Sequence, residues 1–191
     1  MKTARKSLLV ALCAILLVVA SVMGTLAYLT STTEVVKNTF TVGNVKITLD
    51  ELDVDNSTEG ENDRDIANEY HLIPGSTYTK DPTVHMDDDS EDAWLFVKVE
   101  NGIVDIEGDN TIAAQMAANG WALVDGETNI YAYKEIATAE VKDYVVFETI
   151  EISGTADLTD MDEAVVNVTA YAVQAENFDT AADAWAATFG A

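Results

Sequence analysis

The sequence is poor in basic residues, with 10 Lys and Arg against 34 Asp and Glu, and its formal net charge is -24. Proteins hold nucleic acid mainly through Lys and Arg side chains that neutralise phosphates. Anionic membrane surfaces attract basic segments for the same reason. The charge balance therefore excludes a nucleic-acid-binding protein and disfavours one that rests on an anionic membrane surface.

Cysteine and histidine are also scarce, with one cysteine, Cys13, and two histidines, His71 and His85. Catalytic zinc usually takes three protein ligands and most often uses His, and no His-Glu-x-x-His pair is present. No glycine-rich phosphate loop occurs either. The residues therefore assign no catalytic group, and we expect a protein that is not an enzyme and has no resident cofactor.

The first 27 residues have the layout of a secretory signal peptide. Three basic residues among the first six precede thirteen apolar residues, Leu8–Ala20. As a helix this run spans ~20 Å at ~1.5 Å per residue, short of the ~30 Å hydrocarbon core. The small residues Thr25 and Ala27 fit a signal-peptidase pocket, so we expect cleavage before Tyr28. An uncleaved anchor that continues to Leu29 is the alternative.

Export changes both the charge and the chemistry of the chain. The leader carries three basic residues and no acidic ones, so its removal takes the net charge from -24 to -27. Cys13 leaves with it, which makes the mature chain free of thiols and disulfides. A secreted domain without disulfides depends on core packing, for which 164 remaining residues suffice.

The rest of the chain predicts an all-β, antiparallel β-sandwich with two short helices. Alternation in Asn38–Leu52 predicts a half-buried strand. β-Branched and aromatic residues predict further strands at 93–99, 144–150 and 164–173. Ala-rich stretches at 111–119, capped by Asn110, and at 179–187, capped by Thr180 or Asp179, predict the helices. The acidic stretch 53–68 reads as a loop, and Pro74-Gly75 as a turn.

One acidic run is dense enough to suggest a cation. Ca²⁺ prefers several carboxylate and carbonyl oxygens on a flexible loop, but the ordered spacing of an EF-hand is missing here. A plain solvated turn is the alternative. The candidate calcium ligands are Asp87, Asp88, Asp89, Glu91 and Asp92.

Two stretches near the start of the chain are distinctive: the junction Gly24-Thr25-Leu26-Ala27-Tyr28-Leu29-Thr30 and the run Asn38-Thr39-Phe40-Thr41-Val42-Gly43-Asn44-Val45. Together they resemble the start of exported proteins of the TasA and camelysin family. The resemblance extends to Leu72-Ile73-Pro74-Gly75 and to Ala170-Tyr171-Ala172-Val173-Gln174-Ala175, and so covers nearly the whole chain.

The resemblance implies a jelly-roll β-sandwich, released by a SipW-type signal peptidase, that serves as a structural subunit of biofilm matrix fibres outside a Gram-positive bacterium. It implies identical subunits as partners, and an accessory matrix protein as a further one. Camelysin itself is described as a metal-dependent peptidase. Because no zinc-peptidase pattern is present, we do not carry that activity over.

The residues themselves are compatible with a fibre. Freed by cleavage, Tyr28–Lys37 extends ~33 Å at ~3.3 Å per residue, and its apolar residues Tyr28, Leu29, Val35 and Val36 suit side-chain pockets. Donated to a neighbour's open sheet edge, it adds a strand. This contact is heterologous and propagates into a filament. The organisation predicted is therefore a leader at 1–27, a donor segment at 28–37 and a sandwich at 38–191.

Other functions stay open at this point. The segment 28–37 also fits an unattached terminus, or the first strand of its own sandwich. A camelysin-like secreted metallopeptidase and a monomeric surface adhesin or binding module are the alternatives to a fibre subunit.

Overall fold

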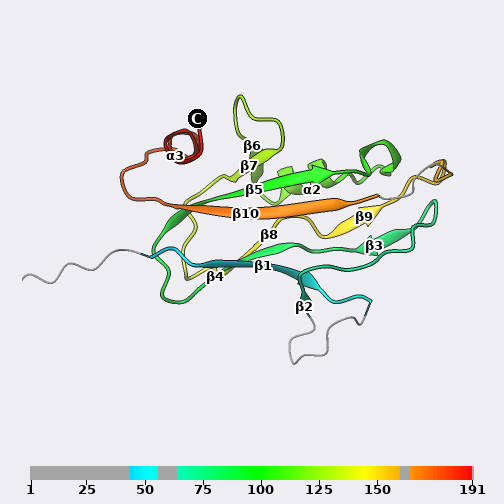
Figure 1. Cartoon of the computed structure of the whole chain (residues 1–191), viewed down its shortest axis with the longest axis horizontal. Helices are drawn as coiled ribbons and strands as arrows, with labels where there is room; N and C mark the ends of the chain where they lie inside the picture. Colours follow the sequence, from blue (N-terminus) through cyan, green and yellow to red (C-terminus); the bar gives the residue numbers. More distant parts are fainter. Residues whose placement is uncertain (1–43, 56–63, 160–163, 191) are drawn as a thin grey trace, which may run out of the picture. The chain divides into compact units, whose positions relative to one another are not determined.

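The computed structural model describes residues 44–55, 64–159 and 164–190. The leader, the cleavage-site residues Thr25, Ala27 and Tyr28, and the whole donor segment lie outside the described residues. The described part of the chain consists mostly of β-strands (Figure 1). These are β1 (Ile47–Leu52), β2 (Arg64–Asp65), β3 (Thr77–Thr79), β4 (Thr83–Met86), β5 (Ala93–Asn101), β6 (Trp121–Leu123), β7 (Ile130–Tyr133), β8 (Asp143–Val145), β9 (Thr149–Glu151) and β10 (Val166–Gln174).

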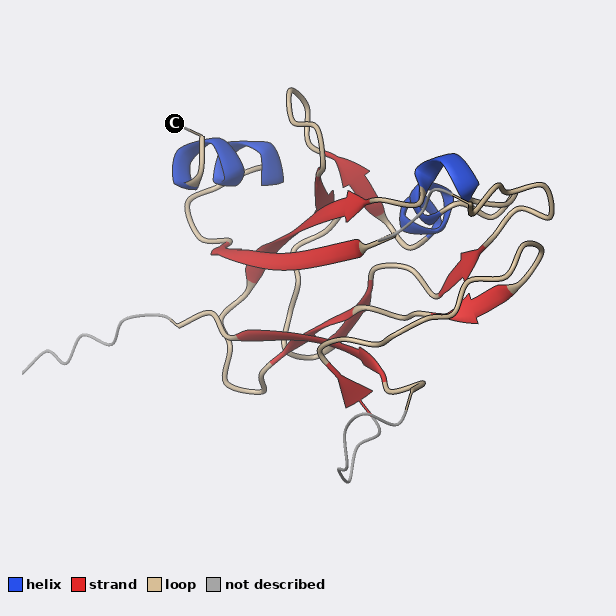
Figure 2. Ribbon diagram, turned by 45° about the vertical axis from the view of Figure 1, so that its right-hand side comes forward, coloured by secondary structure: helices blue, strands red, loops and turns tan. Residues whose placement is uncertain are grey.

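Two four-stranded antiparallel sheets form the layers of the sandwich (Figure 2). The first has the strand order β2-β1-β4-β8 and the second has the order β10-β5-β7-β6. β3 and β9 form a separate two-stranded antiparallel ladder. The main hydrophobic core contains inward side chains from both sheets, such as Val84 of β4 and Leu95 and Val97 of β5. This confirms the all-β prediction with antiparallel sheets and short helices.

Sequence alternation fixes which face of each strand enters the core. Val45, Ile47 and Leu49 pack against the core, as the period-2 pattern of β1 predicts. β5 is buried on both faces, because Trp94 and Phe96 belong to a second cluster on the other side of its sheet. That double burial explains why β5 is an almost continuous apolar run.

The helices are short and lie where the composition predicts them. α2 (Ile112–Ala118) begins at Thr111, whose side chain accepts a hydrogen bond from the backbone N–H of Ala114. The predicted cap, Asn110, is therefore wrong by one residue. α3 (Ala181–Thr188) has Thr180 as its cap and covers the second cluster with Trp185. A 3-10 turn, η1 (Val104–Ile106), follows β5.

One strand prediction and one loop prediction need correction. The stretch 144–150 is not one strand but two, β8 and β9, which lie in different sheets. Between them Val146 and Phe147 are fully buried, and Val146 donates a backbone hydrogen bond to Pro82 instead of continuing the ladder. The stretch predicted as a loop at 53–68 contains β2, held by ion pairs from Arg64.

The turn at Pro74-Gly75 is confirmed, since Gly75 has φ +79° and Ser76 N–H bonds to the Ile73 carbonyl at 3.1 Å. Among the described residues, no helix has both the length and the apolar character needed to cross a bilayer.

Candidate functional site: an open flank between β1 and β10

The candidate site lies where the edges of the two sheets meet. β10 pairs with β5 along one side and is the edge strand of its sheet. β1 pairs with β4 through Ile47–Asp50, whereas β2 covers its other side only at Glu51 and Leu52. Along this flank, which we call the open flank, no described strand pairs with the outer side of β10 or with the outer side of β1 at Ile47–Asp50.

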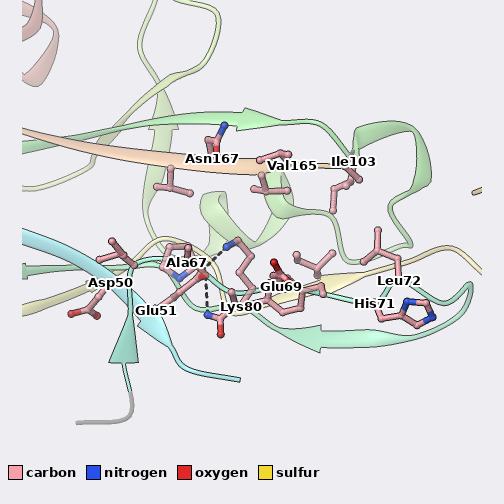
Figure 3. A pocket seen from close by; sticks show the side chains of 18 of the residues that line it. Asp50, Glu51, Ala67, Glu69, His71, Leu72, Lys80, Ile103, Val165 and Asn167 are labelled. Carbon is pink, nitrogen blue, oxygen red and sulfur yellow. Dashed lines mark hydrogen bonds and ion pairs between the residues drawn. The ribbon is translucent and has the colours of Figure 1, made fainter. Parts of the chain in front are cut away.

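A cavity of about 840 Å³ opens at this flank. One wall comes from the inner residues of β1 and the other from the first half of β10, and segment 66–72 forms the lip (Figure 3). Its apolar lining is supplied by Leu49, Leu72, Ile103, Ile150, Leu158, Val166 and Val168. Most of these side chains pack against the main core, so the cavity is continuous with the inside of the sandwich.

A buried ion pair lies on the cavity floor. Glu51 continues the inward face of β1 after Leu49, and its Oε2 accepts a hydrogen bond from Lys80 Nζ at 2.5 Å. The side chains of Glu51 and Lys80 are only 5% and 11% exposed. Figure 3 shows the Lys80 ammonium directed into the space between the sheets. A charged pair thus occupies a place where an apolar core residue is the usual occupant.

Neighbouring side chains hold this pair in place. Asn68 donates to Glu51 Oε1 at 3.0 Å, and the Tyr70 ring lies 5.6 Å from Lys80 Nζ, within cation–π range. Burial, with a smaller contribution from the negative charge of Glu51, raises the pKa of the Tyr70 hydroxyl well above its usual value. Tyr70 therefore stays protonated and donates to the Thr79 carbonyl at 3.0 Å.

A second polar network lies on the outer face of the first sheet. His85 of β4 contacts Asp50 of β1 through Nε2 at 2.8 Å and Asp143 of β8 through Nδ1 at 2.7 Å. Arg64 of β2 also pairs with Asp50 and reaches Asp81 at 3.0 Å. The network joins four neighbouring segments and stiffens the sheet that carries the cavity floor. His71, in contrast, is exposed on the lip.

The rim of the cavity also exposes apolar side chains. Ile66 is 87% exposed and Val165 is 49% exposed, and both line the cavity. Leu52 and Val54 are each 37% exposed on the adjoining segment. Exposed apolar groups around an open sheet edge mark a surface that gains from being covered.

The acidic run proposed for calcium is engaged with lysines. Asp89 pairs with Lys46 at 2.6 Å, and Asp88 pairs with Lys142. Hydrogen bonding to Lys46 lowers the pKa of Asp89. The same loop also holds the start of β1 through three hydrogen bonds. The backbone N–H of Asp87 donates to the Lys46 carbonyl, and the backbone N–H of Glu91 donates to the Asn44 carbonyl. The backbone N–H of Lys46 in turn donates to Ser90 Oγ.

The described residues include no group of three or more His, Cys, Asp or Glu side chains arranged for a metal ion. The calcium ligands Asp87, Asp88, Asp89, Glu91 and Asp92 stay a prediction. No catalytic residue was predicted, and the predicted cleavage-site and donor residues lie beyond the described ranges.

Sequence reasoning missed the cavity and its ion pair. The period-2 pattern of β1 carries an available signal, because Glu51 follows Ile47 and Leu49 on the inward face. Lys80 offers no comparable pattern, since it follows β3 outside any strand and its partner lies 29 residues away.

Comparison of the chain with protein-family models, curated proteins and solved structures finds no match. The described fold defines its class as a mostly β protein of antiparallel sheets with short helices.

Proposed function

We propose that this protein is a secreted structural subunit of extracellular matrix or surface fibres, and that Tyr28–Lys37 of one copy fills the open flank of the next. The observation that carries the proposal is that a cavity of about 840 Å³, lined by core residues, lies beside β10 and the Ile47–Asp50 part of β1, whose outer sides pair with no described strand. An added strand supplies backbone hydrogen bonds to such an edge, and its alternate side chains fill the cavity.

The segment 28–37 suits this occupancy by length and by pattern. At ~3.3 Å per residue, six residues of β1 correspond to ~20 Å, which a ten-residue extended segment of ~33 Å covers completely. Its threonines and valines favour extended backbone. It also lacks proline, so every residue offers an N–H to an edge strand.

Donation to another copy produces a fibre because donor and acceptor are different surfaces. Each added copy brings a new vacant flank, and the chain of contacts does not close. The proposed fold behind this behaviour is a jelly-roll sandwich, supported by two four-stranded antiparallel sheets. Release by a SipW-type signal peptidase then controls assembly, since the leader tethers Tyr28 to the membrane until it is removed.

Charge gives a second control. Copies of net charge -27 after leader removal repel one another over the Debye length of ~8 to 10 Å at physiological salt. Partial protonation of carboxylates, or binding of divalent cations to the acidic surface, reduces this repulsion. We therefore expect mild acid and millimolar Ca²⁺ to promote fibres.

The test is electron microscopy of the protein recovered from culture medium, with its amino terminus sequenced. We expect filaments from protein that begins at Tyr28 and dispersed particles from a variant lacking residues 28–37. Filaments from both would refute strand donation. Dispersed monomers from both, at mild acid and in millimolar Ca²⁺, would refute the fibre function, and chelator-sensitive casein turnover would favour a peptidase.

A further inference from the structure

The cavity floor carries a feature that simple strand addition does not require. A buried ion pair adds little stability compared with well-packed apolar residues, because both charges lose hydration. Glu51 and Lys80 nevertheless occupy inward positions beside the apolar Leu49 and Ile150. Buried polar groups of this kind are best attested as devices that fix register and exclude wrong partners.

The Lys80 ammonium has hydrogen-bonding capacity toward the cavity. An ammonium carries three N–H donors. Among the described residues, Glu51 is the one side chain that accepts a hydrogen bond from it, and Tyr70 contributes a ring face. An occupant that excludes water from this floor must therefore supply an acceptor, or leave charged donors without a partner.

The segment 28–37 has two faces when extended, and they differ in chemistry. One face carries Leu29, Ser31, Thr33 and Val35, with apolar groups at its ends and hydroxyls at its centre. The other face includes Glu34. Turned inward, Glu34 would add a second buried carboxylate beside Glu51, whereas the first face brings no carboxylate into the cavity.

We propose that the Glu51–Lys80 pair selects the register of the strand donated by the neighbouring copy, because it requires the hydroxyls of Ser31 and Thr33 of that strand to lie directly over the pair. Leu29 and Val35 then occupy the apolar lining on either side of the pair, and Glu34 faces solvent. This inference rests on the proposed function and adds to it the inward face and the register of the donor.

The hydroxyls complete the hydrogen bonding of the pair in two ways. A Ser or Thr oxygen accepts from the ammonium, and its O–H donates to the carboxylate. A register shifted by one residue brings Thr30, Thr32 and Glu34 inward instead, and reverses every side chain. The shifted register is therefore penalised, because it brings the Glu34 carboxylate beside the buried Glu51.

The test compares two neighbouring, chemically identical substitutions, Thr33→Val and Thr32→Val, in the full-length protein processed and recovered from culture medium. The critical concentration for filaments is measured by light scattering and checked by electron microscopy. We expect Thr33→Val to raise it about tenfold, the effect of losing one hydrogen bond to a charged group. Thr32→Val should change it less than about twofold, because its side chain faces solvent.

The pair itself supplies the second arm. In a Glu51→Leu/Lys80→Met background, the penalty for Thr33→Val should disappear, and thermal unfolding verifies that this background is folded. Should that background fail to fold, the Thr33→Val and Thr32→Val comparison still decides, because both single variants keep Glu51 and Lys80.

If the wild type forms filaments and the two valine substitutions change the critical concentration equally, the register proposal is overturned and the fibre function stands. A Thr33→Val penalty that persists without the pair would overturn it as well. Absence of wild-type filaments under all conditions would refute the fibre function, and the register proposal with it.

Discussion

The two flanks of the sandwich differ in how they are closed. On the flank formed by β6 and β8, Trp121 Nε1 donates to the Val145 carbonyl at 2.8 Å, and Tyr133 packs edge-on against Tyr144 with ring centroids 5.0 Å apart. α2 adds Gln115, which is buried against the segment before β9. On the opposite flank β1 and β10 leave a cavity of about 840 Å³.

The contrast shows that, among the described residues, large side chains seal one flank, whereas a cavity remains at the other. Trp121 is 2% exposed, whereas Ile66 on the open flank is 87% exposed. The open flank is thus a local feature of β1 and β10 and not a general looseness of the fold. The sealed flank should carry stability, and the open flank should carry association.

The largest expected effect tests the sealed flank. Trp121→Ala removes a buried indole and its hydrogen bond, and we expect the free energy of unfolding to fall by about 4 kcal/mol. Urea unfolding measures the loss. Leu123→Ala on the same strand is the matched control, because Leu123 is 53% exposed and its loss should be below about 1 kcal/mol. Equal losses would show that the buried Trp121 indole does not seal this flank.

The second effect tests the cavity floor. Lys80→Met leaves Glu51 charged and unpaired in a buried position, so unfolding should become easier by about 3 kcal/mol. Adding Glu51→Leu should restore most of this stability, because the uncompensated charge is gone. A double variant as unstable as the single one would show that the pair stabilises the fold itself.

The third effect concerns the polar anchor of the sealed flank. Gln115 accepts backbone hydrogen bonds from Glu148 and Thr149 and donates to the carbonyls of Asn110 and Thr149. Gln115→Ala leaves these groups without their partner, and we expect a loss of about 2 kcal/mol by urea unfolding. A loss near zero would mean that water replaces the amide, and that this flank is less sealed than its geometry indicates.

The smallest effect is a pH dependence at the open flank. The pKa of Tyr70 is raised in the folded protein, so the unfolded chain ionises first, near pH 10. The stability contributed by the neutral hydroxyl is present below pH 10 and is lost as the pH rises above it. Tyr70→Phe should therefore lose less stability between pH 9 and 11 than the wild type, by thermal unfolding at each pH. Parallel curves would contradict this.

Sequence patterns predicted the features that depend on local order. Alternation in β1, the apolar run of β5 and the turn at Gly75 depend on neighbouring residues, and all are confirmed. Of the two caps predicted for α3, Thr180 and Asp179, the structure has Thr180. The split of 144–150 was missed because burial of Phe147 between the sheets, and not β propensity, decides the path there.

The candidate site was less predictable because its parts are distant in sequence. β1 and β10 are more than a hundred residues apart, and the two floor residues, Glu51 and Lys80, meet only through the fold. Arg64 lies in an acidic stretch that predicts a loop, but its ion pairs with Asp50 and Asp81 tie β2 to the sheet. Tertiary partners decide both features, and the local pattern signals only the inward position of Glu51.

Cross-linking between copies tests the central claim most directly. In a Cys13→Ala background, one tagged copy carries Thr32→Cys in the donor segment, and a differently tagged copy carries Asn167→Cys on β10, whose side chain points away from the cavity (Figure 3). With a short bismaleimide, the account predicts a covalent dimer bearing both tags, which persists when residues 28–37 are deleted from the copy that carries Asn167→Cys, because only the other copy donates its segment. No mixed dimer, together with efficient cross-linking inside a single chain that carries both cysteines, would contradict it.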